Sequence, residues 1–142
     1  MPDAYMPQAQ TVEWYTPPEV FDPLHKEFQF TLDVCAADEN AAKCDKFIPP
    51  LVDSLTQIWR PDRCWMNPPY GRGIAAWVKK AAEADTLVVG LLPARTDTAW
   101  WHEFVLRPKA EVRFMRGRVK FLRPDGTRGD AAPFPTVIVI WR

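Results

Sequence analysis

The sequence predicts an α/β protein with one mainly parallel sheet, and three observations lead to this prediction. Short apolar segments alternate with amphipathic ones along the chain, which is the pattern of strands joined by crossover helices. Polar residues directly follow several apolar segments, at the strand ends where such sheets bind ligands. The chain has 142 residues, 47% of them hydrophobic, which gives one real core and leaves too little length for two ordinary domains.

The N-terminal region predicts an irregular segment followed by a helix. Residues 1–15 are expected to form a mobile arm. Residues 16–28 are expected to form a helix, with Thr16 as the N-cap and Pro17 in the first turn, because threonine and proline favour those positions. Pro23 lies inside this pattern, so we expect it to kink the helix or end it early.

The other elements are predicted from hydrophobic periodicity and turn residues. Continuous apolar runs indicate buried strands, and apolar residues at helical spacing indicate helices. The basic segment 118–122 and the apolar segment 136–141 are separated by turn-rich residues, and we expect them to form a C-terminal hairpin at the sheet edge. The predicted strands are 30–36, 46–48, 64–67, 86–94 and 110–115, and the predicted helices are 73–84 and 96–107, the latter capped by Thr96 or Thr98.

Charge is divided unevenly along the chain, although the formal net charge is zero. Residues 1–62 contain 11 acidic and 4 basic side chains, whereas residues 109–142 contain 8 basic and 3 acidic ones. A basic C-terminal third suits a polyanion, and an acidic N-terminal part suits a cationic or hydroxyl-rich small ligand. A solvated mixed surface with chance clustering is the alternative interpretation.

The cysteine pattern and the absence of long apolar runs point to an intracellular, soluble protein. Cys35, Cys44 and Cys64 form no CxxC pair, and only His25 and His102 accompany them, so we expect reduced thiols and no metal site. No apolar run approaches the roughly 18 residues that a membrane span needs. The first ten residues also lack the features of a secretion signal.

The stretch NPPY, residues 67–70, is the strongest chemical signal in the sequence. Two successive prolines remove two N–H donors and leave carbonyl oxygens as acceptors, and Asn67 adds a side-chain oxygen. Two acceptors beside the ring of Tyr70 suit an exocyclic amine on a flat base that stacks on the tyrosine. A simple turn that ends a strand is the alternative.

Six motifs in order resemble the phage-type DNA N-6-adenine-methyltransferases of the Dam class: YTPPEVFDPL, LDVCAADENAAKC, DSLTQIW, WMNPPYG, LLPARTDTAWW and GRVKFL. The resemblance spans about residues 14–142. It implies a Rossmann-like methyltransferase domain over residues 16–142 that uses S-adenosyl-L-methionine and acts on double-stranded DNA. It further implies methyl transfer to N6 of a flipped-out adenine, by a phage or prophage protein that protects DNA from restriction in the host bacterial cytoplasm.

The resemblance also implies roles for particular residues. Asn67, Pro68, Pro69 and Tyr70 would form the catalytic pocket for the target base. Asp33 would meet the methionine ammonium of the cofactor and Asp53 its adenosine, whereas a structural acid and a helix N-cap are their respective alternatives. No glycine-rich loop follows Asp33, where VCAADEN stands instead. The full set of implied cofactor-binding residues is Thr16, Pro17, Asp33, Cys35, Ala36, Asp53 and Asn67.

Basic residues near the predicted pocket are candidates for DNA contact. Arg116, Arg118 and Lys120 alternate along the segment RGRVKFLR, so they are expected to share a face and follow phosphates. Arg72, after the NPPY stretch, and Arg95 complete the predicted set. His102 is interpreted as structural or solvent-facing, because methyl transfer to an amine needs no strong base.

Two other functions are compatible with these residues. The first is methylation of another amino group, such as cytosine N4, an RNA adenine or a protein glutamine. The second is a non-catalytic DNA-binding module that kept the fold, for which an intact NPPY stretch and Asp33 would have no use.

Overall fold

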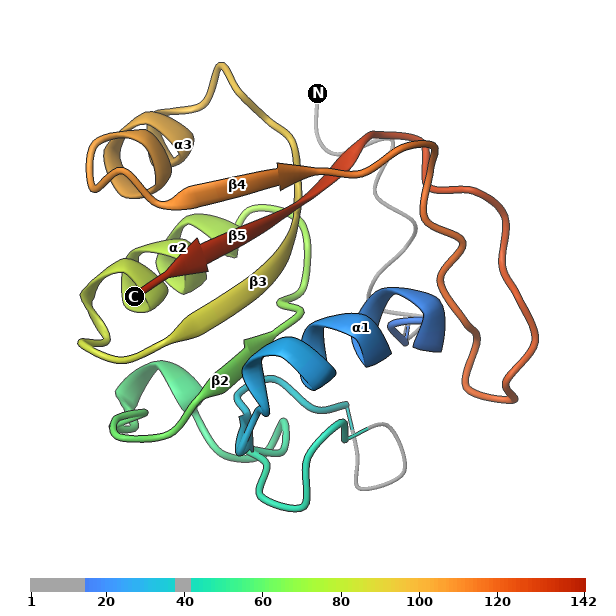
Figure 1. Ribbon diagram of the computed structural model, residues 1–142, viewed down its shortest axis with the longest axis horizontal. Coiled ribbons are helices and arrows are strands. Elements are labelled where there is room, and N and C mark those ends of the chain that lie inside the picture. The colour runs from blue at the N-terminus through green and yellow to red at the C-terminus, as the bar shows by residue number, and fades with distance from the viewer. Residues whose placement is uncertain (1–14, 38–41) are drawn as a thin grey trace.

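The computed structural model describes residues 15–37 and 42–142, and its centre is a five-stranded sheet with helices on both faces (Figure 1). The predicted α/β class is confirmed. The strand order is β1-β2-β3-β5-β4. The strands are β1 (Leu32–Asp33), β2 (Cys64–Met66), β3 (Val88–Pro93), β4 (Glu111–Phe114) and β5 (Thr136–Trp141).

The sheet is mixed, so the predicted parallel arrangement is found only from β1 to β3. β1 pairs parallel with β2, and β2 pairs parallel with β3. β5 runs antiparallel to both of its neighbours, β3 and β4. The strands β1, β2 and β3 therefore end at one edge of the sheet, at Asp33, Met66 and Pro93. We call this the carboxyl edge.

The predicted C-terminal hairpin is wrong, because β5 pairs with β3 and β4 and not with residues 118–122. All six residues of β5 are buried, and a strand so apolar is stable in the interior of a sheet, where it has a partner on each side. Residues 118–122 alternate basic and apolar side chains, which suits a segment with one face in water.

Residues 115–135 form a folded-back excursion between β4 and β5, which we call the arm (Figure 1, orange to red). Its two halves are joined by backbone hydrogen bonds from Ala132 to Val119, from Gly129 to Phe121 and from Arg123 to Thr127. The turn at the tip places Gly126 at a φ of 87°, a conformation that glycine adopts at little cost. A hairpin-like structure does exist here, but residues 118–122 pair within the arm.

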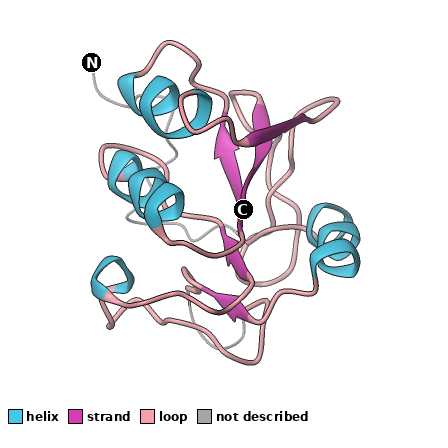
Figure 2. Cartoon of the chain, turned by 60° about the vertical axis from the view of Figure 1, so that its left-hand side comes forward, coloured by secondary structure: helices cyan, strands magenta, loops and turns pink. Residues whose placement is uncertain are grey.

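Helices cover both faces of the sheet (Figure 2). Among the helices of the described residues, α1 covers one face by itself (Figure 2), and its buried Phe21 and Leu24 belong to a cluster with Trp65 of β2 and Leu91 of β3. The second cluster occupies the opposite face, between the sheet and the remaining helices. The helical elements are α1 (Pro18–Phe28), η1 (Ser54–Thr56), α2 (Ile74–Glu83), α3 (Ala99–Trp101) and the π-helical turn η2 (His102–Leu106).

The start of α1 differs from the prediction in a way that bears on the site. Pro17 and not Thr16 occupies the N-cap position, and no side chain caps the helix. The backbone carbonyl of Pro17 accepts hydrogen bonds from the N–H groups of Val20 and Phe21. Pro23 does not end the helix, which continues to Phe28 because Leu24 still has a core to pack against.

Several other elements are shorter than predicted. The segment 30–36 forms only the two-residue strand β1, and 46–48 contributes a single parallel bridge from Phe47 to Asp33. The helix expected over 96–107 begins after Thr98, whose side chain accepts a hydrogen bond from the N–H of Trp101. Within the described residues, no helix is long and apolar enough to cross a membrane.

Candidate active site

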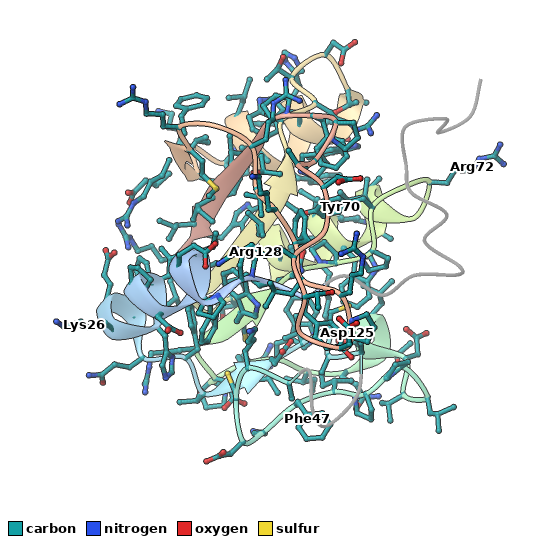
Figure 3. The ribbon with its side chains drawn as sticks, turned by 90° about the vertical axis from the view of Figure 1, so that its right-hand side faces the viewer. Lys26, Phe47, Tyr70, Arg72, Asp125 and Arg128 are labelled. Carbon is teal, nitrogen blue, oxygen red and sulfur yellow. The ribbon has the colours of Figure 1, made fainter. Side chains whose placement is uncertain are left out.

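The NPPY stretch leaves β2 at the carboxyl edge, next to the ends of β1 and β3. β2 ends at Met66 because the prolines that follow Asn67 cannot donate to a sheet. Pro68 is buried, whereas Asn67 and Tyr70 are half-buried. Among the described residues, no donor bonds the carbonyl oxygen of Pro68, so this acceptor has no partner within that part of the chain. Figure 3 faces this edge, with Tyr70 near its centre.

The structure brings together two predicted site residues that lie 51 positions apart in the sequence, Thr16 and Asn67. The side-chain nitrogen Nδ2 of Asn67 donates a hydrogen bond to Oγ1 of Thr16 over 3.0 Å. Thr16 is only 2% exposed, so the bond is shielded from water. With Nδ2 engaged, the acceptor oxygen of the same amide remains for another partner.

Tyr70 is fixed in place by a hydrogen bond and by two aromatic neighbours. Its hydroxyl donates to the carbonyl oxygen of Leu91 in β3 over 2.7 Å. The rings of Phe121 and Phe134 meet the tyrosine ring edge-on, with centroids 6.2 and 5.7 Å away. Burial raises the pKa of the Tyr70 hydroxyl above its ordinary value. Tyr70 therefore offers a fixed aromatic ring and no readily lost proton.

Phe121 and Phe134 are site residues that sequence analysis missed. Val119 and Phe121 alternate with the basic Arg118 and Lys120, so an inward orientation of Phe121 could have been inferred from spacing, although its contact with Tyr70 could not. Phe134 lies between two prolines just before β5, and no local pattern indicates its partner. Its contact with Tyr70 follows only from the position of β5 beside β3.

Asp33 is a buried carboxylate at the end of β1, 3% exposed. One of its oxygens accepts a hydrogen bond from the N–H of Cys35 and the other from the N–H of Lys43, each over 3.0 Å. Burial raises the pKa of this carboxyl, and the two N–H groups oppose that rise. Asp33 thus organises the loop after β1, and each oxygen retains capacity for a further hydrogen bond.

The other predicted cofactor-binding residues are placed around the same loop or at η1. The N–H of Ala36 donates to the carbonyl of Ile48 over 3.3 Å, so the backbone donors of Cys35 and Ala36 are both used within the protein. The side chain of Asp53 accepts from the N–H of Leu55 and caps η1. Pro17 is buried next to Thr16. Residues 38–41, which comprise the end of the VCAADEN segment and the residue after it, lie outside the described residues. The N-terminal segment 1–15, predicted to be mobile, also lies outside them except for Tyr15.

The predicted DNA-binding residues lie in three separate places. Arg72 is exposed in the turn after NPPY and points away from the body of the protein (Figure 3). Arg95 follows β3, and its guanidinium lies 5.8 Å from the ring centroid of Phe134. Arg116, Arg118 and Lys120 are exposed along the first half of the arm.

The arm is anchored to α1 as well as to the site. Tyr15 and Leu122 exchange two backbone hydrogen bonds, of 2.8 and 2.9 Å. Arg128 forms an ion pair with Glu19 in the first turn of α1, with one N–O distance of 2.9 Å. The same arm contributes Phe121 to the surroundings of Tyr70. Its basic first half therefore lies on a segment that contacts the NPPY stretch.

The cysteines are free thiols, and burial is the main cause of their raised pKa values. The pKa of Cys35, Cys44 and Cys64 is raised to about 12 in each case, so these groups are protonated and unreactive near neutral pH. Among the described residues, no group of three or more His, Cys, Asp or Glu side chains is arranged to hold a metal ion.

Fold and site together define an α/β protein whose carboxyl edge places the amide of Asn67 and the carbonyl of Pro68 near the tethered ring of Tyr70. The family model described as DNA N-6-adenine-methyltransferase (Dam) matches residues 3–142. The chain belongs to this family and is an enzyme of the DNA adenine methyltransferase class.

Two phage proteins illustrate the similarity. The DNA N-6-adenine-methyltransferase of Haemophilus phage HP1 (strain HP1c1) is 31% identical over 134 residues, which cover 90% of this chain and 77% of the relative. The DNA N-6-adenine-methyltransferase of Escherichia phage T1 is 36% identical over 102 residues, covering 68% of this chain and 42% of that protein. The family resemblance inferred from the motifs is confirmed.

Proposed function

We propose that this protein transfers a methyl group from S-adenosyl-L-methionine to N6 of adenine in double-stranded DNA, with the target base flipped out of the duplex. The observation that carries the proposal is the pairing of Asn67 with Thr16, which leaves amide and carbonyl acceptors at the end of β2 beside the ring of Tyr70. The family to which the chain belongs supports the same reaction.

Asn67 and Pro68 act on the amino group of the target base. The side-chain oxygen of Asn67 and the carbonyl oxygen of Pro68 accept the two hydrogens of that group. The two bonds increase electron density on the nitrogen and turn its lone pair toward the incoming methyl group. The ring of Tyr70 holds the base by stacking, and its tethered hydroxyl keeps the ring from turning.

The residues at the end of β1 and the start of α1 fit S-adenosyl-L-methionine in their chemistry. The cofactor supplies an electrophilic methyl group on a sulfonium. Asp33 is a buried carboxylate with remaining acceptor capacity, which suits an ammonium. Asp53 uses one carboxylate oxygen to cap η1, and its other oxygen could accept from hydroxyl groups of the cofactor. Cys35, Ala36 and Pro17 would line the same region.

DNA would be held by basic side chains from three parts of the chain. Arg72 lies in the turn after the NPPY stretch, Arg116, Arg118 and Lys120 lie along the arm, and Arg95 follows β3 beside the ring of Phe134. Guanidinium and ammonium groups bind phosphates without reading sequence, so they would position the duplex while the pocket selects the base. The phage relatives suggest a role in phage DNA modification in the bacterial cytoplasm.

The reaction is tested by incubating the purified protein with unmethylated double-stranded DNA and methyl-labelled S-adenosyl-L-methionine, followed by nucleoside analysis by mass spectrometry. Labelled N6-methyladenine is the expected product. Labelled N4-methylcytosine would contradict the choice of base. The absence of any methylated nucleoside, with cofactor binding shown by calorimetry, would indicate an RNA or protein acceptor. Failure to bind the cofactor would favour a non-catalytic DNA-binding module.

Asn67→Ala is expected to abolish methylation while leaving the fold and cofactor binding largely intact. The substitution removes the side-chain acceptor for the target amine, and losing such a group costs about 100-fold or more in rate. The exposed Gln57→Ala serves as the control and should retain wild-type turnover. If Asn67→Ala methylated DNA at the wild-type rate, the assignment of Asn67 to the pocket for the target base would be contradicted.

A further inference from the structure

Thr16 carries a buried hydroxyl whose hydrogen-bond partner is the catalytic amide. A polar side chain that is only 2% exposed is costly to bury unless it forms a hydrogen bond. The hydroxyl does not cap α1, because Pro17 holds that position. Its partner is Nδ2 of Asn67, at 3.0 Å.

The backbone on either side of Thr16 is held firmly. Its neighbour Tyr15 exchanges two backbone hydrogen bonds with Leu122 of the arm. On the other side, the carbonyl of Pro17 accepts from two N–H groups of α1. The hydroxyl of Thr16 is therefore a fixed point against which the side chain of Asn67 is oriented.

Orientation matters for an asparagine that must accept hydrogen bonds. A half-turn of the terminal amide exchanges its oxygen and nitrogen, and the nitrogen would then face the target amine donor to donor. We propose that Thr16 is a positioning residue: the target amino group, as a donor, selects Oδ1 of Asn67, and the Thr16 hydroxyl accepts from Nδ2 and holds the amide in that orientation. This inference rests on the proposed function, and it gives Thr16 a role different from the cofactor contact that the family resemblance implied.

Two substitutions at Thr16 separate positioning from packing. Thr16→Val keeps the shape of the side chain and removes the hydroxyl, whereas Thr16→Ser keeps the hydroxyl and removes a methyl group. We expect Thr16→Val to lower kcat by about tenfold, the equivalent of one lost hydrogen bond, with both KM values within about twofold of wild type. Thr16→Ser should retain kcat within about twofold, because its hydroxyl still accepts.

The control is Thr136→Val, the same substitution at another buried threonine, and it should leave kcat unchanged. A packing role for Thr16 would reverse the order of the variants, because serine leaves a space and valine does not. A cofactor contact would instead weaken S-adenosyl-L-methionine binding in calorimetry and raise its KM at unchanged kcat. Either result overturns the positioning role.

The wild-type reaction in the same assay distinguishes failure of this inference from failure of the proposed function. Wild-type formation of N6-methyladenine with equal kcat in Thr16→Val would overturn the positioning role alone. If the wild-type protein forms no N6-methyladenine, the proposed function itself fails, and the positioning role fails with it.

Discussion

Asp33 is a buried side chain with a structural role, to which we add a proposed role in binding the cofactor. Its two oxygens hold the loop after β1 by accepting from Cys35 and Lys43, and the carboxylate still presents negative charge at the carboxyl edge. Burial raises the pKa of Asp33, so the group becomes neutral at a higher pH than an exposed aspartate does.

The affinity for S-adenosyl-L-methionine is therefore expected to fall as pH is lowered through the raised pKa of Asp33. Protonation removes the charge that attracts the cofactor ammonium, which stays positive throughout the range from about pH 7 to about pH 4.5. Calorimetry over that range measures the effect. Asp33→Asn should bind more weakly and with little pH dependence.

Asp85→Asn is the matched control for that experiment. Asp85 is exposed and precedes β3, at the opposite edge of the sheet, and asparagine tolerates its positive φ of 55°. This variant should keep the wild-type pH profile. The assignment of Asp33 would be contradicted if Asp33→Asn retained the wild-type profile as well.

At the scale of elements, the arm carries exposed basic residues and also contacts the NPPY stretch. It is anchored by Tyr15 and by the ion pair of Arg128 with Glu19, and it supplies Phe121 to the ring of Tyr70. Its exposed basic residues thus extend from an anchored segment. If they bind DNA phosphates, this anchoring favours contacts at defined positions along the DNA backbone.

Charge removal in the double variant Arg116→Gln, Arg118→Gln is expected to weaken DNA binding and reduce its salt dependence. The logarithm of the affinity falls with the logarithm of the salt concentration, and each lost phosphate contact makes this negative slope shallower by about 0.9. Fluorescence anisotropy over a salt series measures this slope. The control is Lys79→Gln, Arg107→Gln, in which the altered residues are exposed on α2 and before β4. Equal slopes for the two double variants would exclude the arm as a phosphate-binding element.

The sequence predicts local structure well where a single residue type determines the backbone conformation or a helix cap. The prolines of the NPPY stretch end β2 as expected, and Thr98 caps the helix that follows it. The partner of 136–141 was predicted wrongly, because strand pairing depends on contacts across more than 40 residues that no local pattern records. The prediction that Thr16 caps α1 was wrong for a related reason, because its hydroxyl instead accepts a hydrogen bond from Asn67, 51 residues away in the sequence.

At the scale of the whole molecule, the two hydrophobic clusters lie on opposite faces of the sheet. Packing is tight at Gly90, in the centre of the sheet. Gly90 lies in β3 between β2 and β5. A Cβ atom at this position would lie 3.1 Å from Cε of Met66 and 3.4 Å from the ring of Trp141. A side chain at position 90 would therefore require Met66 or Trp141 to shift by a few tenths of an ångström.

Gly90→Val is expected to lower the free energy of unfolding by about 1–3 kcal/mol, the usual cost of overpacking a core. Chemical denaturation measures the change. Gly73→Val, where nothing lies within 4 Å of the added Cβ and φ is −79°, should have a much smaller effect. Equal destabilisation by the two substitutions would show that the packing around Gly90 relaxes freely.

The position of the arm in the chain has a consequence for how such proteins can diversify. Phe114 and Val137 are paired in the sheet, so the arm leaves and re-enters at adjacent points. A loop with fixed, neighbouring ends can lengthen at little cost, since each doubling adds only about 0.6 kcal/mol of closure entropy. The tip of the arm can therefore change in length or sequence, in evolution or by design, while the NPPY stretch and β1 to β3 keep their structure.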